Sequence, residues 1–369
     1  MSQELKILYI DDDATHRKDL KELLSGEIIN GFAISIDCEE SFDKAVGQSK
    51  RYHLTILDLF EGNPQSGHDV GSTVFEKIKN TLFIPVIFYS GNTSNVISLR
   101  SQIVGVATKG DGGVDELKSE IERLTKHNIP FLRNSVHAYV EQEFKKYFWN
   151  VIQKENDKFT PNADDFSLGY MLLRNFADSL SKENIKNILS DNTIDHEKVH
   201  PMEFYIYPID VHKEYENGEI IKDKINNEIF VVLTPSCDFI ERFKKGKSEG
   251  RSVDEVLLIK TKLLTECKEF KIYKQTQNKE NKSNLEKLIN SGKGDRYFFL
   301  PKAPFIENRI IDFQLNNTVS YIDLTTGFDR IAKLDSPFAQ SMTSSFIRYY
   351  NRIGFPDIDT EYVINHLNL

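Results

Sequence analysis

The chain has 369 residues, too many for one ordinary hydrophobic core, so we expect two or three domains. Its composition, with 39% hydrophobic and 28% charged residues, is typical of a folded globular protein, and no apolar run approaches the roughly 20 residues of a membrane span. The formal net charge of −9 argues against a nucleic-acid-binding surface that extends over the whole protein.

The first 127 residues alternate short apolar runs with helix-like segments. The apolar runs predict five strands, at residues 6–10, 32–37, 53–60, 84–91 and 105–110. The other segments predict five helices, at residues 15–24, 40–49, 71–80, 95–103 and 114–127. Strands rich in Val, Ile and Leu that are separated by helices indicate a parallel sheet with both faces covered. We therefore expect an α/β domain over residues 1–127.

Polar side chains follow four of the predicted strands at the point where each strand ends. Asp11 and Asp12 follow the first strand, Asp58 the third, Ser90 the fourth and Lys109 the fifth. Ligands of such sheets bind beyond the carboxyl ends of the strands. The sequence therefore predicts that three acids, one hydroxyl and one amine meet at one edge of the sheet.

The three acids suggest why a carboxylate stands at the end of a buried strand. Clustered carboxylates repel one another, and they stay ionised together if a divalent cation such as Mg²⁺ lies among their oxygens. A carboxylate whose charge is neutralised by a metal can act as a nucleophile toward phosphorus. A hydroxyl and an ammonium group can then bind the oxygens of the transferred phosphoryl group. We therefore expect Asp58 to accept a phosphoryl group.

Four stretches together resemble the receiver (CheY-like) domain of two-component response regulators, over about residues 4–127. They are "YIDDD" for the acid pair, "LTILDLF" for the phosphoacceptor, "VIFYSG" for the hydroxyl and "VATKG" for the lysine. The resemblance implies a flavodoxin-like (βα)5 fold and a sensor histidine kinase as the phosphoryl donor. It also implies that Asp58 carries the phosphoryl group and that Ser90 and Lys109 contact it.

The same resemblance implies a metal site. Mg²⁺ would be held by Asp12, Asp58 and the backbone carbonyl of Phe60, with support from Asp11.

The chain also departs from the receiver pattern at several places. The family usually has proline after the lysine, where this chain has Gly110. No aromatic residue precedes the lysine on its strand, and Ala107 stands two residues before it. The stretch "EGNPQSGHDVG" at residues 61–71 is longer than the usual loop. We therefore expect intact phosphorylation chemistry and an altered output surface.

Residues 128–369 have less regular patterns. We expect helices at 134–155 and 165–191 in a helical linker or subdomain over residues 128–200. Residues 201–369 are expected to form an α+β domain around a small antiparallel SH3-like barrel or curled sheet. Its β-rich segments are predicted at residues 203–211, 218–239, 255–263, 296–300, 310–315 and 319–324, and its helices near 284–291 and at 336–355.

One β-rich stretch leaves a second function open. "GEIIKDKINNEIFVVLTPSCDF" resembles the opening of SH3-like barrels, including toxin ribonucleases of the MazF type, over about 20 residues. A receiver-gated effector with a C-terminal toxin-like ribonuclease domain is therefore the alternative. A complete catalytic set is missing, because no histidine can be assigned as the base for Cys237, and we expect this cysteine to be a buried small hydrophobe.

Two further motifs approach the patterns of known sites, but we expect neither to form a functional site. "HEKVH" matches a zinc motif at His196 and His200, but Pro201 disfavours a helix there, so we expect no zinc. "RNSVH" approaches the spacing of HEPN ribonucleases, but Arg133 and His137 are expected to form a solvated helical face.

The sequence thus favours a phosphoacceptor protein of a two-component phosphorelay over an enzyme. The whole chain is similar to the receiver-containing phosphate-buffer protein of Detocs-type antiphage systems, which implies a second response regulator or effector as a further partner. No helix-turn-helix pattern is evident, so we expect no DNA binding. The absence of a secretory signal and of CxxC pairs predicts a cytoplasmic protein. The oligomeric state stays open.

Overall fold

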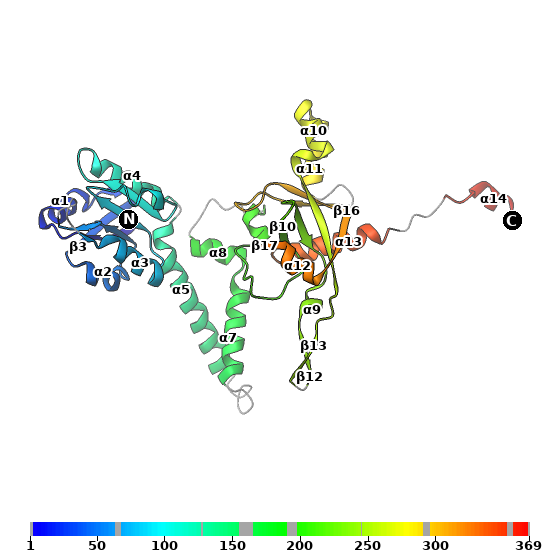
Figure 1. The fold of residues 1–369 in the computed structure, drawn as a ribbon, viewed down its shortest axis with the longest axis horizontal. Coiled ribbons are helices and arrows are strands. Elements are labelled where there is room, and N and C mark those ends of the chain that lie inside the picture. Colours follow the sequence, from blue (N-terminus) through cyan, green and yellow to red (C-terminus); the bar gives the residue numbers. More distant parts are fainter. Residues whose placement is uncertain are drawn as a thin grey trace. The chain divides into compact units, whose positions relative to one another are not determined.

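In a computed structural model the chain forms two compact units, Met1–Ile194 and Asp195–Leu369, called here the N-terminal and C-terminal units (Figure 1). The structure describes residues 3–62, 68–126, 128–154, 165–189, 198–244, 246–290, 296–352 and 357–367. Within these ranges, no helix combines the length and the apolar character that a bilayer crossing requires.

The N-terminal unit is built on a six-stranded sheet with the order β2-β3-β1-β4-β7-β8. Its strands are β1 Glu4–Ile10, β2 Ile28–Ile29, β3 Phe32–Glu39, β4 Leu54–Leu57, β7 Val86–Ser90 and β8 Val104–Thr108. Five of them pair in parallel, and β2 joins β3 as a short antiparallel edge strand. The parallel strands follow the order of flavodoxin-like folds, which confirms the fold expected of residues 1–127.

Two helices cover each face of this sheet. One face carries α1 Ala14–Leu24 and α4 Gly113–Thr125, and the other carries α2 Phe42–Ser49 and α3 Gly71–Thr81. Leu20 of α1 and Ile121 of α4 pack into the first apolar cluster, and Val74 of α3 packs into the second. Both faces are therefore buried, which is why the strands are apolar on both sides.

The segment predicted as a helix over residues 95–103 is mostly irregular. Only a 3₁₀ turn, η1 Ile97–Leu99, forms there. The N–H of Ser101 donates forward to the carbonyl of Val104 at 2.9 Å, whereas a helix would direct it back to Ile97. Arg123 of α4 fixes this shape, because its guanidinium donates to the carbonyl oxygens of Ser101 and Val104 at 2.6 and 2.9 Å. The helix prediction was wrong because these tertiary contacts leave no local sequence signal.

A helical segment follows the sheet within the N-terminal unit. Its elements are α5 Ile129–Tyr147, the π-helical turn η2 Phe148–Gln153, α7 Asp165–Ser179 and α8 Lys182–Leu189. Helix α5 begins before the predicted start at residue 134, with Pro130 in its first turn, a position that favours proline. The ring of Phe131 lies 4.9 Å from that of Phe32, measured between centroids, and anchors α5 to the sheet.

The C-terminal unit is built on a seven-stranded antiparallel sheet with the order β15-β16-β14-β11-β10-β17-β9. Its strands are β9 Tyr205–Ile206, β10 Glu219–Asp223, β11 Ile229–Val232, β14 Glu255–Leu263, β15 Tyr297–Leu300, β16 Arg309–Ser320 and β17 Phe328–Leu334. Its two edge strands, β15 and β9, do not pair with each other, so over the described residues the sheet is open and does not close into a barrel. Figure 1 shows that the sheet is curled.

Helices lie on both faces of this sheet. α13 Phe338–Tyr350 packs on one face through Met342, and α9 Ser236–Phe239 and α12 Tyr321–Gly327 pack on the other through Phe239 and Leu324. The remaining elements are η3 Pro201–Phe204, η4 Leu264–Glu266, α10 Lys268–Gln275, α11 Lys279–Ile289, α14 Thr360–Asn365 and the hairpin of β12 Arg242–Lys244 with β13 Lys247–Gly250.

Two strand predictions for the C-terminal unit were wrong in part, and some of its elements were missed. Of residues 203–211, only β9 is a strand. Residues 319–324 were expected to be a strand, but β16 ends at Ser320 and α12 follows, because the Ser320 hydroxyl accepts from the N–H of Asp323 at 3.0 Å and caps the helix. Helix α10 and strand β17 were not predicted at all.

Candidate functional site

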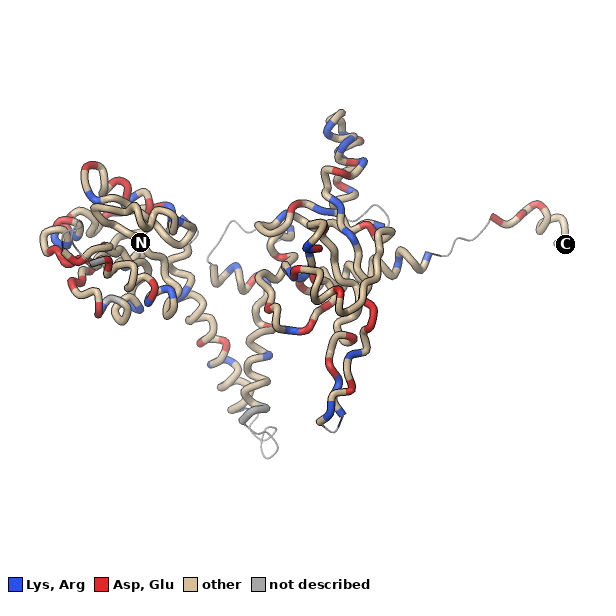
Figure 2. The backbone as a smooth tube through the Cα atoms, viewed as in Figure 1, with Lys and Arg blue, Asp and Glu red and all other residues tan. Residues whose placement is uncertain are grey.

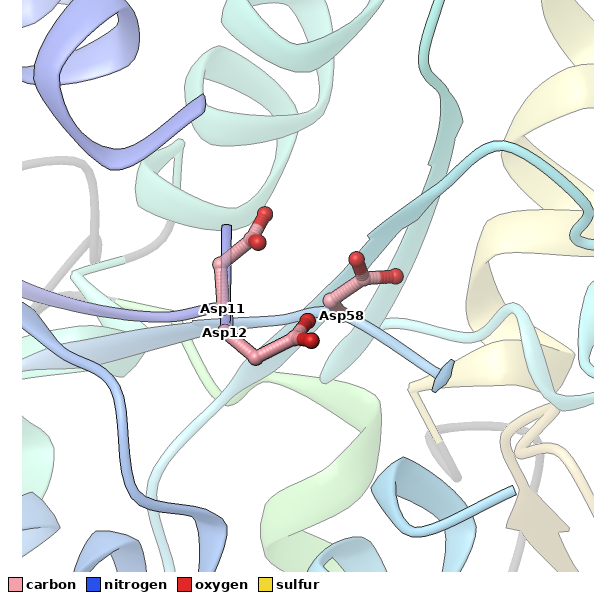
Figure 3. Close-up of side chains that lie close together, drawn as sticks. All are labelled: Asp11, Asp12 and Asp58. Carbon is pink, nitrogen blue, oxygen red and sulfur yellow. The ribbon is translucent and has the colours of Figure 1, made fainter. Parts of the chain in front are cut away.

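Three carboxylates meet at the carboxyl ends of two neighbouring strands of the N-terminal sheet. Asp11 and Asp12 follow β1, and Asp58 follows β4, its pairing partner. Each offers one oxygen, and these oxygens lie within 4.8 Å of one another (Figure 3). Asp11 is fully buried and Asp58 is 7% exposed, so water screens their mutual repulsion weakly. The structure therefore brings together the three acids that the sequence singled out.

Lys109 brings a positive charge into this cluster from the end of β8. Its Nζ lies 2.6 Å from Oδ2 of Asp11 and 2.5 Å from Oδ2 of Asp58. Burial lowers the pKa of Lys109, but the carboxylates of Asp58 and Asp11 outweigh it and raise the pKa above its usual value. Lys109 therefore stays charged, and it contacts two of the three acids, Asp11 and Asp58.

Backbone N–H groups fix the direction of each carboxylate. The N–H of Asp13 donates to Oδ1 of Asp11 at 2.8 Å. The N–H of Gly62 donates to Oδ2 of Asp12 at 2.8 Å, and the N–H of Leu59 donates to Oδ1 of Asp58 at 2.7 Å. These bonds leave Asp12 and Asp58 with unused lone pairs. Oxygen ligands that carry excess negative charge suit Mg²⁺, so the donor set fits the metal that the sequence suggests.

The hydroxyl of Ser90 is buried and has no hydrogen-bond partner among the described residues. Ser90 ends β7, next to β8, and its carbonyl accepts the N–H of Lys109 at 2.9 Å. A buried hydroxyl without a partner is costly, and native proteins keep few of them. Ser90 is thus available to hydrogen-bond an incoming ligand.

Sequence reasoning missed two side chains of this site. The Tyr9 hydroxyl donates to Oδ2 of Asp11, and burial together with the Asp11 charge raises the pKa of Tyr9, so the hydroxyl keeps its proton. His16 Nδ1 lies 3.4 Å from Lys109 Nζ. The available signal for Tyr9 was a hydroxyl within "KILYI", an otherwise buried strand.

Gly71 at the start of α3 is needed for the close approach of that helix. A Cβ at this position would lie 2.3 Å from the backbone carbonyl oxygen of Asp58.

The long stretch after Asp58 forms part of the site's surroundings. It contains a short hairpin of β5 Phe60–Glu61 and β6 His68–Asp69. The Phe60 ring is 8% exposed and packs into the second apolar cluster. A cavity of about 400 Å³ lies beside Asp12 and is lined by further acids, among them Glu40, Asp43 and Glu61. Its negative field favours cations near the site.

The other motif residues lie apart from the acidic cluster. His200 caps η3, where its Nδ1 accepts the N–H of Met202 at 3.2 Å, and His196 lies outside the described residues. His137 is exposed, as expected, whereas Arg133 is only partly exposed, because it donates to the Lys50 carbonyl at 2.6 Å and its Nη1 is buried. Cys237 is exposed rather than buried, because it lies in the short helix α9, which turns its Phe239 toward the core.

The C-terminal unit has a cavity of about 580 Å³ between β17, α13 and the loop before α9. Two of its charged side chains are already paired, since Lys333 contacts both carboxylate oxygens of Glu216 at 2.9 Å. The described residues that line it include no histidine or cysteine. Figure 2 shows Lys, Arg, Asp and Glu interspersed along the described backbone of both units.

When the chain is compared with known proteins, only solved structures are found to be similar to it. No protein-family model matches the chain, and no curated protein matches it. A response regulator receiver protein from Sinorhizobium medicae matches at 19% identity, covering 33% of this chain and 94% of its own, with a TM-score of 0.26. A response regulator receiver domain from Clostridium thermocellum matches at 21% identity, covering 33% and 95%, with a TM-score of 0.26.

The signal receiver domain of a putative Luxo repressor from Vibrio parahaemolyticus matches at 20% identity, covering 36% of this chain and 97% of its own, with a TM-score of 0.27. Each likeness covers about a third of the chain, and the fold of the N-terminal unit rests on its own strand order.

Proposed function

We propose that the N-terminal unit accepts a phosphoryl group from a sensor histidine kinase onto Asp58. The observation that carries the proposal is the cluster of Asp11, Asp12 and Asp58, which Lys109 bridges at 2.6 and 2.5 Å. Among the described residues, three clustered acids and the one lysine that contacts two of them leave an excess of negative charge, whereas a purely structural ion pair would be balanced. A divalent metal and a phosphoryl group supply what this arrangement lacks.

Each residue has a definite part in the proposed transfer. A carboxylate oxygen of Asp58 forms the new bond to phosphorus as the phosphorus–nitrogen bond of the donor breaks and the imidazole leaves. Lys109 and the unpartnered Ser90 hydroxyl then bind phosphoryl oxygens. Mg²⁺, held by Asp12, Asp58 and the Phe60 carbonyl with support from Asp11, would neutralise the charge that gathers there.

A narrower proposal concerns the role of the whole chain. We propose a receiver domain over residues 1–127, a helical linker over 128–200 and an α+β domain over 201–369. The chain would store phosphate in a Detocs-type antiphage system and so compete with a second response regulator for the kinase. The lack of a histidine or cysteine in the described lining of the C-terminal cavity favours storage over the ribonuclease alternative.

The test of phosphoacceptor function is intact mass of the full chain after incubation with a small acyl-phosphate donor and Mg²⁺. One phosphate adduct is expected in the wild type, none in Asp58→Ala, and an unchanged adduct in Asp115→Ala, which changes an exposed acid of α4. The adduct should also disappear in excess chelator. An adduct that survives Asp58→Ala would place the acceptor elsewhere.

A further inference from the structure

Tyr9 brings a hydroxyl into the buried floor of the acidic cluster. The side chain is fully buried on β1, and its ring lies 6.4 Å from that of Tyr89, measured between centroids. Burying a hydroxyl costs free energy unless it finds a partner, and phenylalanine would fill the same space without that cost. The partner here is Oδ2 of Asp11, to which the hydroxyl donates.

The same oxygen of Asp11 also accepts a hydrogen bond from the ammonium group of Lys109. Nζ of Lys109 lies 2.6 Å from it, and the N–H of Asp13 occupies the other oxygen of Asp11 at 2.8 Å. The hydroxyl and the ammonium thus share one carboxylate oxygen. A shared oxygen holds each donor less strongly than it would hold one alone, because its negative charge is divided between them.

We propose that Tyr9 is a positioning residue for phosphoryl transfer, acting on Lys109 through Asp11. It holds the Asp11 carboxylate in place and divides its charge, so that Lys109 can leave Asp11 and move to a phosphoryl oxygen. The inference rests on the proposed function of Asp58. Without the hydroxyl, Asp11 keeps Lys109 more tightly, and fewer Lys109 side chains are free to assist the transfer.

The experiment compares Tyr9→Phe with the wild type by the rate of adduct formation on Asp58 at saturating donor. The rate is expected to fall about tenfold. The Mg²⁺ concentration for half-maximal rate should not change, because Asp12 and Asp58 are the proposed direct ligands. A loss of order in the site would instead raise that concentration and lower the melting temperature.

Two further variants make the test specific. Tyr89→Phe is the matched control, because its ring lies in the same cluster and its hydroxyl makes no hydrogen bond within the described part of the chain, so the rate should stay at the wild-type value. In an Asp11→Asn background, Tyr9→Phe should slow the reaction less than about twofold, since the carboxylate through which it acts is gone.

Wild-type rates in Tyr9→Phe, or an equal loss in the Asp11→Asn background or in Tyr89→Phe, would overturn the role of Tyr9 and leave the proposed function standing. A wild type that forms no adduct on Asp58 would overturn both.

Discussion

The C-terminal unit and the acidic cluster of the N-terminal unit bury acidic side chains in opposite ways. In the C-terminal unit, buried Glu219 meets Arg330 at 2.6 Å, and buried Asp312 meets Arg296 and Lys262 at 2.8 and 2.9 Å. Cations there match or outnumber the acids.

In the acidic cluster of the N-terminal unit, Lys109 contacts two of the three acids, Asp11 and Asp58, and the Ser90 hydroxyl has no hydrogen-bond partner among the described residues. Buried charge that is fully paired specifies a structure, whereas charge left in excess prepares a site for a ligand. The comparison therefore supports the chemistry that we propose for the N-terminal unit.

Removing the cation that pairs with a buried acid of the C-terminal unit should lower the stability of that unit alone. Arg330→Ala leaves Glu219 buried and uncompensated, and we expect a loss of about 3–5 kcal/mol in the free energy of unfolding of that unit. Hydrogen exchange of peptides from β10 and β17 measures it, while adduct formation on Asp58 should persist. Lys224→Ala, which removes a partly exposed pair with Asp329, should cost less than about 1 kcal/mol. If both variants behave alike, Glu219 is not held by Arg330 as described.

Removing Lys109, the cation of the acidic cluster, should instead slow the phosphorylation of Asp58. Lys109→Ala is expected to slow phosphorylation about 100-fold, or about 2.7 kcal/mol of barrier, because a charge-assisted contact to the phosphoryl group is lost. Its melting temperature should not fall, since the proposed Mg²⁺ can neutralise the acids that lose their partner. The control is Lys79→Ala on α3, an exposed lysine that should leave the rate unchanged. A wild-type rate in Lys109→Ala would remove the lysine from the mechanism.

Phe60 tests whether the site is built to store phosphate. Its ring cannot hydrogen-bond an attacking water, so Phe60→Asn should speed loss of the phosphoryl group about tenfold, or about 1.4 kcal/mol. Because the ring also packs into an apolar cluster, Phe60→Leu is the matched control, and its phosphoryl lifetime should equal that of the wild type. The decay of adduct mass after removal of the donor measures both. Equal acceleration in the two variants would show that packing, not water activation, controls the lifetime.

The paired acids also predict how the C-terminal unit responds to acid. Burial raises the pKa of the Asp312 carboxyl, but hydrogen bonds from Arg296 and Lys262 outweigh it and lower the pKa below its usual value. The unfolded chain therefore binds this proton more readily, so Asp312 stabilises the fold above about pH 3.9 and less as the pH falls through its folded pKa.

Unfolding of the C-terminal unit between pH 5 and 2 should show this small effect. Asp312→Asn is expected to give a shallower loss of stability than the wild type, and an identical pH dependence would contradict the pairing.

The sequence alone determined the fold of the first 127 residues and the positions of Asp11, Asp12, Asp58, Ser90 and Lys109. This was possible because apolar runs mark buried parallel strands locally and the carboxyl ends of such strands share one edge. Polar residues that follow those runs are therefore brought together by the topology, whatever the rest of the chain does.

Only the tertiary structure decided the contacts that join distant residues. Tyr9 lies two residues before Asp11 in the sequence, but the sharing of one Asp11 oxygen with Lys109 depends on how β1 and β8 lie in one sheet. Arg330 and Glu219 are 111 residues apart, and their pairing follows from β17 lying next to β10. Such pairings leave no local pattern, because the free energy that selects them comes from packing and charge compensation in the folded state.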